Sequence, residues 1–87
     1  MTSLSDQLGR ATGSISANLT EGYSRIGPRD RCKFYEYALG SAREARDWYY
    51  QARDVLGPEI TEHRLAHLTS ISRVIAKLIS NLRSRSP

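Results

Sequence analysis

The sequence is poor in cysteine and lacks any long apolar run. Its 87 residues include one cysteine, Cys32, which cannot form a disulfide within the chain. A lone thiol is typical of proteins in a reducing compartment, so we expect a cytoplasmic protein. No apolar run approaches the roughly 18 residues of a membrane-spanning helix, and no signal peptide is recognisable. We therefore expect no membrane partner.

The sequence also lacks a recognisable catalytic set. His63 and His67 stand four residues apart, a spacing that can hold a metal ion, but Arg64 occupies the position where an HExxH motif carries glutamate. No third ligand is evident, and Cys32 has no histidine near it in the sequence. The sequence thus predicts no catalytic residue, no metal site, no cofactor and no small-molecule substrate.

Charge and length indicate which partners to consider. The net charge is +4 and the isoelectric point about 9.6, which permits RNA or DNA as a partner without requiring it. A chain of 87 residues buries only about 60–65% of its unfolded surface, so its stability is marginal. Because no disulfide can help, we expect a homo-oligomer.

The spacing of apolar residues predicts three helices. They span about 4–23, 28–56 and 62–83, and short connections make them antiparallel neighbours. No segment alternates apolar and polar residues, so strands are not expected. The predicted fold is all-α: an antiparallel up-and-down bundle of three helices in a single domain, 1–87. Residues 84–87 are expected to form a frayed tail.

The first predicted helix has an apolar stripe and a face of small residues. Ser3 is its expected N-cap. The apolar stripe consists of Leu4, Leu8, Ala11, Ile15 and Leu19. The small-residue face consists of Ser5, Gly9, Gly13 and Ala17. A glycine inside a water-exposed helix costs up to about 1 kcal/mol relative to alanine. We therefore interpret this face as a seam where another backbone comes close; glycines tolerated on an unimportant face are the alternative.

The second predicted helix carries three longitudinal bands. Pro28 suits its first turn, and Gly57 suits a left-handed C-cap. The core band consists of Phe34, Ala38, Ser41, Ala45, Trp48, Ala52 and Val55, widened by Tyr37, Tyr49 and Leu56. The basic band consists of Leu39, Arg43, Arg46, Tyr50 and Arg53. The acidic band consists of Glu36, Gly40, Glu44, Asp47, Gln51 and Asp54.

Gly40 and Ser41 lie in the middle of the second helix, where glycine is unfavourable. We interpret Gly40 as a close crossing with the first helix, with the Ser41 hydroxyl bonding locally or across; a kink is the alternative. Together with Gly9 and Gly13, Gly40 makes up the predicted helix-crossing residues.

Polar residues at the edges of the apolar stripes need partners. These residues are Ser14, Asn18, Glu21, Ser41 and Glu44. We expect them to join, with nearby arginines, in a network that fixes the register of the helices. A ligand site is the alternative interpretation.

The third predicted helix begins after Thr61, its expected N-cap. Its buried stripe consists of Leu68, Ile71, Ile75, Leu78, Ile79 and Leu82. Arg73 and Lys77 are expected to point toward water.

The candidates for nucleic-acid binding are Arg43, Arg46, Tyr50, Arg53, Arg73 and Lys77. Cations can track phosphates, and Tyr50 can stack on a base. Two other interpretations of the basic band stay open. It can be an ordinary solvated face, or it can face the acidic band of a neighbouring subunit in a head-to-tail assembly.

Residues along the first helix and the first half of the second resemble a known family. The matching residues are Gln7, Leu8, Arg10, Ala11, Ser14, Ile15, Asn18, Leu19, Glu21, Gly22, Tyr23 and Arg25, then Phe34, Tyr35, Ala38, Gly40, Ser41 and Glu44. The sequence resembles the four-helix-bundle proteins encoded in intervening sequences of bacterial large-subunit ribosomal RNA genes. Accessory variability proteins of diversity-generating retroelements are related to them.

The resemblance implies a helical bundle, ring-shaped homo-oligomers such as pentamers, suspected binding of nucleic acid and no enzymatic activity. Two departures accompany it. The family has one more helix before the segment that is 4–23 here, so the bundle corresponds to a four-helix bundle without its first helix. In addition, the family often has phenylalanine just after the acidic residue that opens the second helix, where this chain has Asp30-Arg31, and this places a charge at the end of the bundle.

Overall fold

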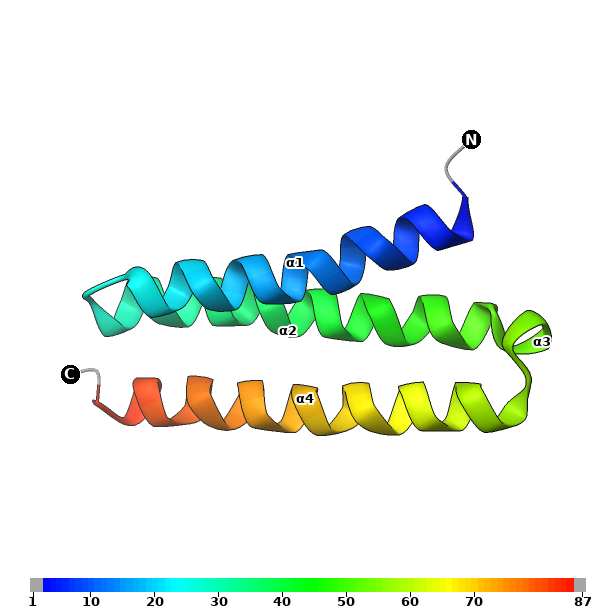
Figure 1. The fold of residues 1–87 in the computed structure, drawn as a ribbon. Coiled ribbons are helices and arrows are strands. Elements are labelled where there is room, and N and C mark those ends of the chain that lie inside the picture. The colour runs from blue at the N-terminus through cyan, green and yellow to red at the C-terminus, as the bar shows by residue number, and fades with distance from the viewer. Residues whose placement is uncertain (1–2, 86–87) are drawn as a thin grey trace.

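The computed structural model describes residues 3–85 and contains four helices in that range (Figure 1). They are α1 (Leu4–Ser24), α2 (Pro28–Gln51), α3 (Arg53–Leu56) and α4 (Pro58–Arg85). This part of the chain contains no strand, so the predicted all-α fold is confirmed.

The three long helices form a shallow, elongated layer with α2 in the middle. α2 packs against α1 on one side and against α4 on another, and both neighbours run antiparallel to it (Figure 1). The layer measures 47 × 26 × 14 Å along its principal axes. No helix among the described residues is long and apolar enough to cross a membrane.

Three residues begin or end helices as predicted. Ser3 Oγ accepts a hydrogen bond from the backbone N–H of Asp6 at 3.0 Å, which caps α1. Pro28 occupies the first position of α2, where its missing N–H has no helical partner to lose. Gly57 ends α3 with φ 86° and ψ 162°, a positive-φ conformation that glycine adopts most easily, although not the predicted left-handed helical one.

The predicted helix 28–56 is interrupted at Ala52, so the prediction of one unbroken helix is wrong. The backbone of Ala52 has ψ near 3°, and α3 follows as a short separate turn that leaves the axis of α2 (Figure 1). At the interruption, Arg53 Nη1 donates a hydrogen bond of 2.9 Å to the carbonyl of Tyr50. A side chain thus helps to satisfy the backbone where the helix ends.

The last helix is longer at both ends than predicted. It begins at Pro58 instead of 62, because a proline fits the first helical turn. Thr61 is therefore not its N-cap: it is buried, and its hydroxyl donates to the Gly57 carbonyl at 2.7 Å. Ser84 and Arg85 are helical, so the predicted frayed tail is wrong for these two residues. The other two residues of that tail, 86–87, lie outside the described residues.

Small residues dominate the core where α2 meets its neighbours. The buried core consists of Ala11, Ile15, Tyr35, Ala38, Ala42, Ala45, Leu68, Ile75, Ile79 and Leu82. Ala38, Ala42 and Ala45 are fully buried. Because alanine side chains are short, both α1 and α4 can lie close to the axis of α2.

The predicted core bands are only partly correct. Tyr37 is half exposed and Val55 is 86% exposed, whereas Tyr35 and Ala42, outside the predicted band, are buried. The physical reason is that α2 has neighbours on two sides, so its buried sector lies between them, and Val55 leaves that sector with α3. Leu78, predicted to be buried in the last helix, is 38% exposed.

α1 and α2 come close together at Gly22. A Cβ at this buried glycine would lie 2.7 Å from a ring carbon of Tyr35. Arg31 secures the same end of α1 by donating to the carbonyls of Gly22 at 3.2 Å, Tyr23 at 3.1 Å and Arg25 at 2.8 Å. The positive charge of Arg31 therefore lies at the C-terminal end of α1, which is the negative end of the dipole of that helix.

We predict that Gly22→Ala destabilises the fold by about 1–3 kcal/mol, because the methyl group cannot fit against Tyr35 without moving it. Gly40→Ala is the matched control. Nothing lies within 4 Å of its Cβ position, so alanine there should stabilise the helix by about 0.5–1 kcal/mol. Urea denaturation of both variants measures the difference, and equal effects would contradict the assigned contact.

Candidate nucleic-acid interface

A small polar cluster joins α1 to α2 midway along the bundle. The hydroxyl oxygens of Ser14 and Ser41 lie 2.7 Å apart, which is a hydrogen bond between the two helices. Asn18 Nδ2 donates to the Ser14 carbonyl at 2.9 Å and to the Ser14 hydroxyl at 3.0 Å. All three side chains are half-buried. These three residues of the predicted network therefore lie together, and Ser41 bonds across to α1.

The two glutamates predicted for this network are not part of it. Glu21 is exposed and pairs with Arg25 at 2.6 Å, one turn further along the chain. Glu44 is exposed and accepts a hydrogen bond from Trp48 Nε1 at 3.3 Å. Both carboxylates point to water, where their charge is solvated, so the network that fixes the register is smaller than predicted and uncharged.

The predicted helix crossing at Gly40 is also wrong. No neighbouring atom lies within 4 Å of a Cβ position at Gly9, Gly13 or Gly40. Gly40 instead lines a groove between α2 and α4, where Ala76 and Ser80 are too small to fill the space. Within the described chain, no backbone covers Gly9 and Gly13, so a seam with another chain stays a prediction.

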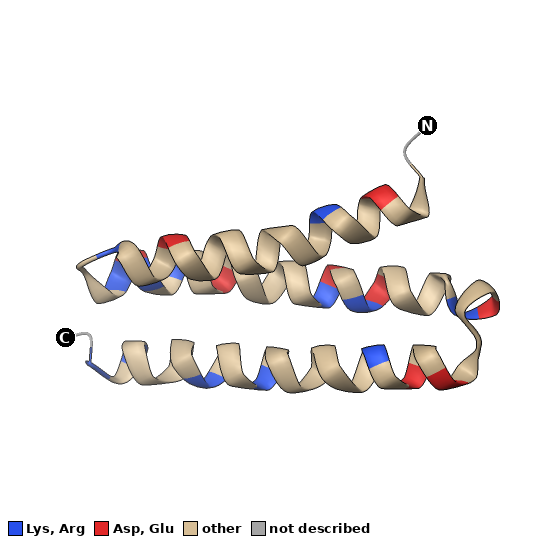
Figure 2. Cartoon of the chain, in the orientation of Figure 1, with Lys and Arg blue, Asp and Glu red and all other residues tan. Residues whose placement is uncertain are grey.

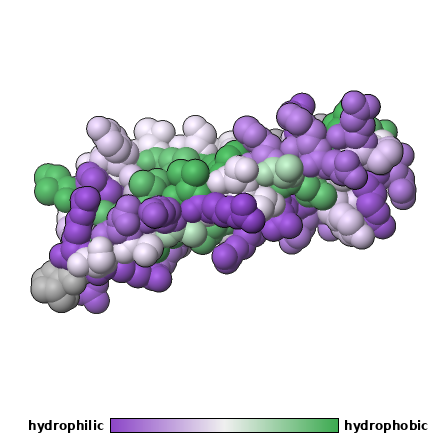
Figure 3. Space-filling model, turned by 90° about the horizontal axis from the view of Figure 1, so that it is seen from below, coloured by the Kyte–Doolittle hydropathy of each residue, from purple (hydrophilic) through white to green (hydrophobic). Residues whose placement is uncertain are grey.

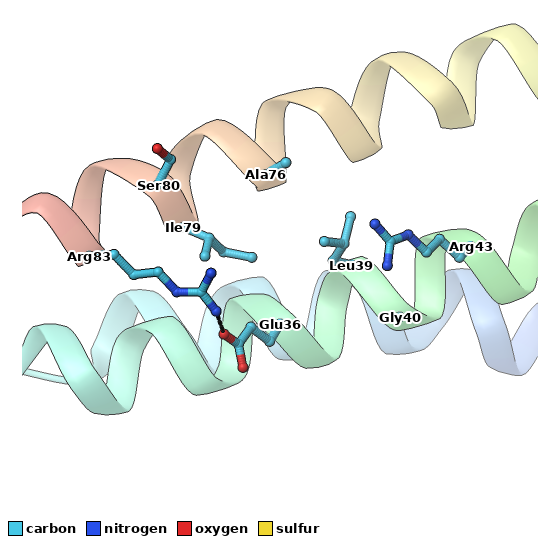
Figure 4. Close-up of a pocket in the computed structure, with 8 residues that line it drawn as sticks. All are labelled: Glu36, Leu39, Gly40, Arg43, Ala76, Ile79, Ser80 and Arg83. Carbon is cyan, nitrogen blue, oxygen red and sulfur yellow. Dashed lines mark hydrogen bonds and ion pairs between the residues drawn. The ribbon is translucent and has the colours of Figure 1, made fainter.

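The groove beside Gly40 has charged residues along it (Figure 4). Its volume is about 400 Å³. The Arg83 guanidinium of α4 pairs with the Glu36 carboxylate of α2 at one end, and Arg43 lies at the other end. The hydrogen bond and the charge of Glu36, with a smaller contribution from Cys32, raise the pKa of Arg83. Arg83 is thus fully protonated and partly neutralised.

The antiparallel register brings basic residues of two helices to the same level. Glu36 lies opposite Arg83, and Arg43 borders the same groove as Ala76. Arg46 lies three residues after Arg43, and Arg73 lies three residues before Ala76, so the antiparallel register brings Arg46 to the level of Arg73. Both are exposed, as are Arg43 and Lys77. Figure 2 shows basic positions along both α2 and α4, whereas α1 carries only Arg10.

Tyr50 and Arg53 form a contact of their own at the end of α2. The guanidinium carbon of Arg53 lies 4.1 Å from the centre of the Tyr50 ring, a cation–π distance. Tyr50 is 54% exposed. A cation thus lies over the Tyr50 ring, and about half of this side chain is accessible to solvent. The six predicted nucleic-acid residues are all exposed, spread over α2, α3 and α4.

The uneven distribution of acidic and basic residues along α4 was not among the sequence predictions. The helix carries Glu59 and Glu62 in its first turns, and then no acidic residue up to Arg85. The basic residues of that acid-free segment are Arg64, Arg73, Lys77, Arg83 and Arg85. Counting charge along each helix separately, instead of for the whole chain, would have revealed it.

The histidines and the cysteine form no cluster. His63 and His67 are stacked with ring centres 6.3 Å apart, and Cys32 Sγ lies 3.6 Å from a Glu36 carboxylate oxygen. In residues 3–85, no three His, Cys, Asp or Glu side chains gather in a way that could hold a metal ion.

The family described as 23S rRNA-intervening sequence protein matches residues 1–81. The chain belongs to this family. The resemblance of the sequence to the intervening-sequence proteins is therefore confirmed. Comparison with curated proteins and with solved structures yields no match.

We predict that Ser41→Ala costs about 1 kcal/mol of stability, because it removes the hydrogen bond that joins α1 to α2. Glu44→Ala is the control: its carboxylate is exposed, so the change should stay within about 0.5 kcal/mol. Thermal and urea unfolding measure both. If Glu44→Ala lowered the stability as much as Ser41→Ala does, Glu44 would belong to the polar network after all.

Proposed function

We propose that this intervening-sequence protein is a cytoplasmic, non-enzymatic homo-oligomer that binds RNA or DNA through phosphate contacts. The observation that carries the proposal is the acid-free part of α4, residues 63–85, where Arg73 and Lys77 are exposed. Neither residue has an ion pair with any described carboxylate. Cations that are not neutralised within the protein are the ones that release counterions when they meet phosphates.

Residues of α2 and α3 extend this basic surface. Arg43 and Arg46 are exposed, and the register of the two helices brings Arg46 to the level of Arg73. The exposed Tyr50 side chain, which Arg53 contacts, offers an aromatic ring on which an unpaired base can stack. A surface of this composition favours single-stranded nucleic acid and reads little sequence. The family description names ribosomal RNA, which makes RNA the first ligand to test.

A second candidate function is a self-assembling scaffold in which the charged bands meet between subunits. It is favoured by the exposure of Glu44, Asp47 and Asp54, because these acidic residues form no ion pair within the described residues. Glu36 is already engaged by Arg83 within the chain, so one member of the acidic band is not free for a neighbour.

We predict that a short fluorescein-labelled single-stranded RNA binds with an affinity that falls steeply between about 50 and 200 mM salt. The double variant Arg73→Gln, Lys77→Gln removes two phosphate contacts. The slope of log K against log salt should therefore become shallower by about 1.4. Fluorescence anisotropy at a series of salt concentrations measures both slopes.

The matched control for this experiment is Arg10→Gln, Arg29→Gln. It removes the same charge from exposed positions on α1 and at the start of α2. This control should retain the wild-type slope. If the two double variants changed the slope equally, RNA binding would depend on net charge alone, and the α4 surface would be rejected as the binding site. Absence of RNA and DNA binding at physiological salt would reject the proposal in favour of the scaffold.

A further inference from the structure

The groove between α2 and α4 at Gly40 has an apolar floor between two cations. Its volume of about 400 Å³ is within the usual range of small-molecule sites. Leu39 and Ile79 lie in its middle, and the guanidinium groups of two arginines lie on either side of them (Figure 4). Arg43 is exposed, and the Arg83 side chain is 66% exposed. A ligand can therefore reach both guanidinium groups from solvent.

Both arginine side chains extend toward the middle of the groove (Figure 4). Arg43 forms no ion pair with a carboxylate of residues 3–85. Arg83 donates from Nη2 to the Glu36 carboxylate, and its Nη1 points away from that carboxylate (Figure 4). Because a guanidinium has five N–H donors, this ion pair leaves donors of Arg83 for a second acceptor. Glu36 thus holds Arg83 at the groove without using all of its hydrogen-bonding capacity.

Gly40 provides the room between the two arginines. Glycine is among the least favourable residues in a helix interior. No neighbouring atom lies within 4 Å of its Cβ position, so packing within the described chain gives no reason for glycine here. Gly40 lies between Glu36 and Arg43 along α2 and lines the groove. A larger side chain at this position would therefore extend into the space that a ligand can use.

The other side of α4 differs in chemistry. Toward α1 it has two hollows of about 460 and 320 Å³, which share Leu19 and Ile71 in their lining. Figure 3 views the molecule from the α4 side and shows hydrophobic residues gathered over the middle of this face, bordered by hydrophilic ones. The arginine that lines these hollows is Arg64, whereas the groove at Gly40 has two arginines. Only in the groove at Gly40, of these three spaces, can guanidinium groups bind an anion from two sides.

The spacing and the charge of the groove fit one phosphodiester. Glu36, which holds Arg83, and Arg43 are seven residues apart, about 10 Å along the helix axis. Because both arginine side chains extend inward, the gap between their guanidinium groups is shorter than this. Phosphate oxygens point in several directions, so one group can accept hydrogen bonds from both arginines. Two arginines and one glutamate leave a single net positive charge, which matches the single negative charge of a phosphodiester.

The groove continues toward the basic surface described above. Arg46 and Arg73 lie at one level, one helical turn beyond Arg43. A strand with one phosphate in the groove would therefore bring its next phosphates to Arg46 and Arg73.

We propose that the groove at Gly40 binds one phosphodiester of a nucleic-acid strand between Arg43 and Arg83, with the adjoining sugar over Gly40. This inference rests on the proposed function for the choice of a nucleic-acid phosphate as the anion. It adds Arg83 to the binding residues and gives Gly40 a role in binding.

Filling the groove tests the site without changing the charge of the protein. Gly40→Leu should weaken binding of the labelled RNA about tenfold. The slope of log K against log salt should become shallower by about 0.7, the share of one phosphate in a single strand. The variant should resist urea at least as well as the wild type, because leucine is a better helix former than glycine. Unchanged RNA affinity, or a loss of affinity accompanied by a change of mass in light scattering, would overturn the proposal.

A double-variant cycle tests whether Gly40 and Arg43 act on the same phosphate. Gly40→Leu and Arg43→Gln should each weaken RNA binding, but the two together should weaken it little more than either alone. Arg73→Gln is the matched control, because Arg73 is exposed and does not line the groove. Its effect should multiply with that of Gly40→Leu. If the effects of Gly40→Leu and Arg43→Gln also multiplied, the two residues would not share a phosphate, and the proposal would fail.

A dinucleotide with a single phosphodiester separates this site from the proposed function. In an NMR titration at constant ionic strength, uridylyl-uridine should shift the amide signal of Gly40 until it saturates, whereas uridine, which lacks phosphate, should not. Inorganic phosphate should bind more weakly, because it lacks the sugar. No saturable shift with the dinucleotide, an equal shift with uridine, or tighter binding of inorganic phosphate would overturn the site. Binding of the dinucleotide without binding of longer RNA or DNA would leave the site standing and reject the proposed function.

Discussion

The close packing of three alanines on α2 is the contact on which the rest of the structure depends. Ala38, Ala42 and Ala45 are fully buried, and larger side chains there would push α1 or α4 away. With both helices held close to α2, the hydroxyl groups of Ser14 and Ser41 come within hydrogen-bond distance. The same packing sets the antiparallel register that brings basic residues of α2 and α4 to one level. The position of the proposed nucleic-acid surface therefore depends on how little volume the central helix occupies.

Much of the fold could be predicted from local patterns, because these patterns report local chemistry. Ser3, Pro28 and Gly57 act on the backbone within a few residues of themselves, and each begins or ends a helix where predicted. The interruption at Ala52 could not be predicted in this way, because the chain there continues in helical periodicity. The departure of α3 depends on where the return to α4 must begin, which is a property of the packed helices.

The candidate site was also only partly predictable from local sequence patterns. Ser14, Asn18 and Ser41 were predicted to lie together, and they do, because positions of like phase on two packed helices must meet. Glu21 and Glu44 have nearly the same phase but end in water, since a long carboxylate can reach solvent from the edge of a contact. Gly22 was missed as the contact point because its role depends on one ring, that of Tyr35, far along the chain.

The hydrogen bonds of Arg31 and of the Ser14–Ser41 pair affect the order in which the helices unfold locally. They are polar ties between α1 and α2, so this hairpin has directional bonds at its turn and at its middle. α4 is held to α2 by apolar packing and by the exposed pair of Glu36 and Arg83. In native-state hydrogen exchange, the amides of α4 would exchange before those of the hairpin. The helix with the acid-free segment is thus the one held least by directional bonds.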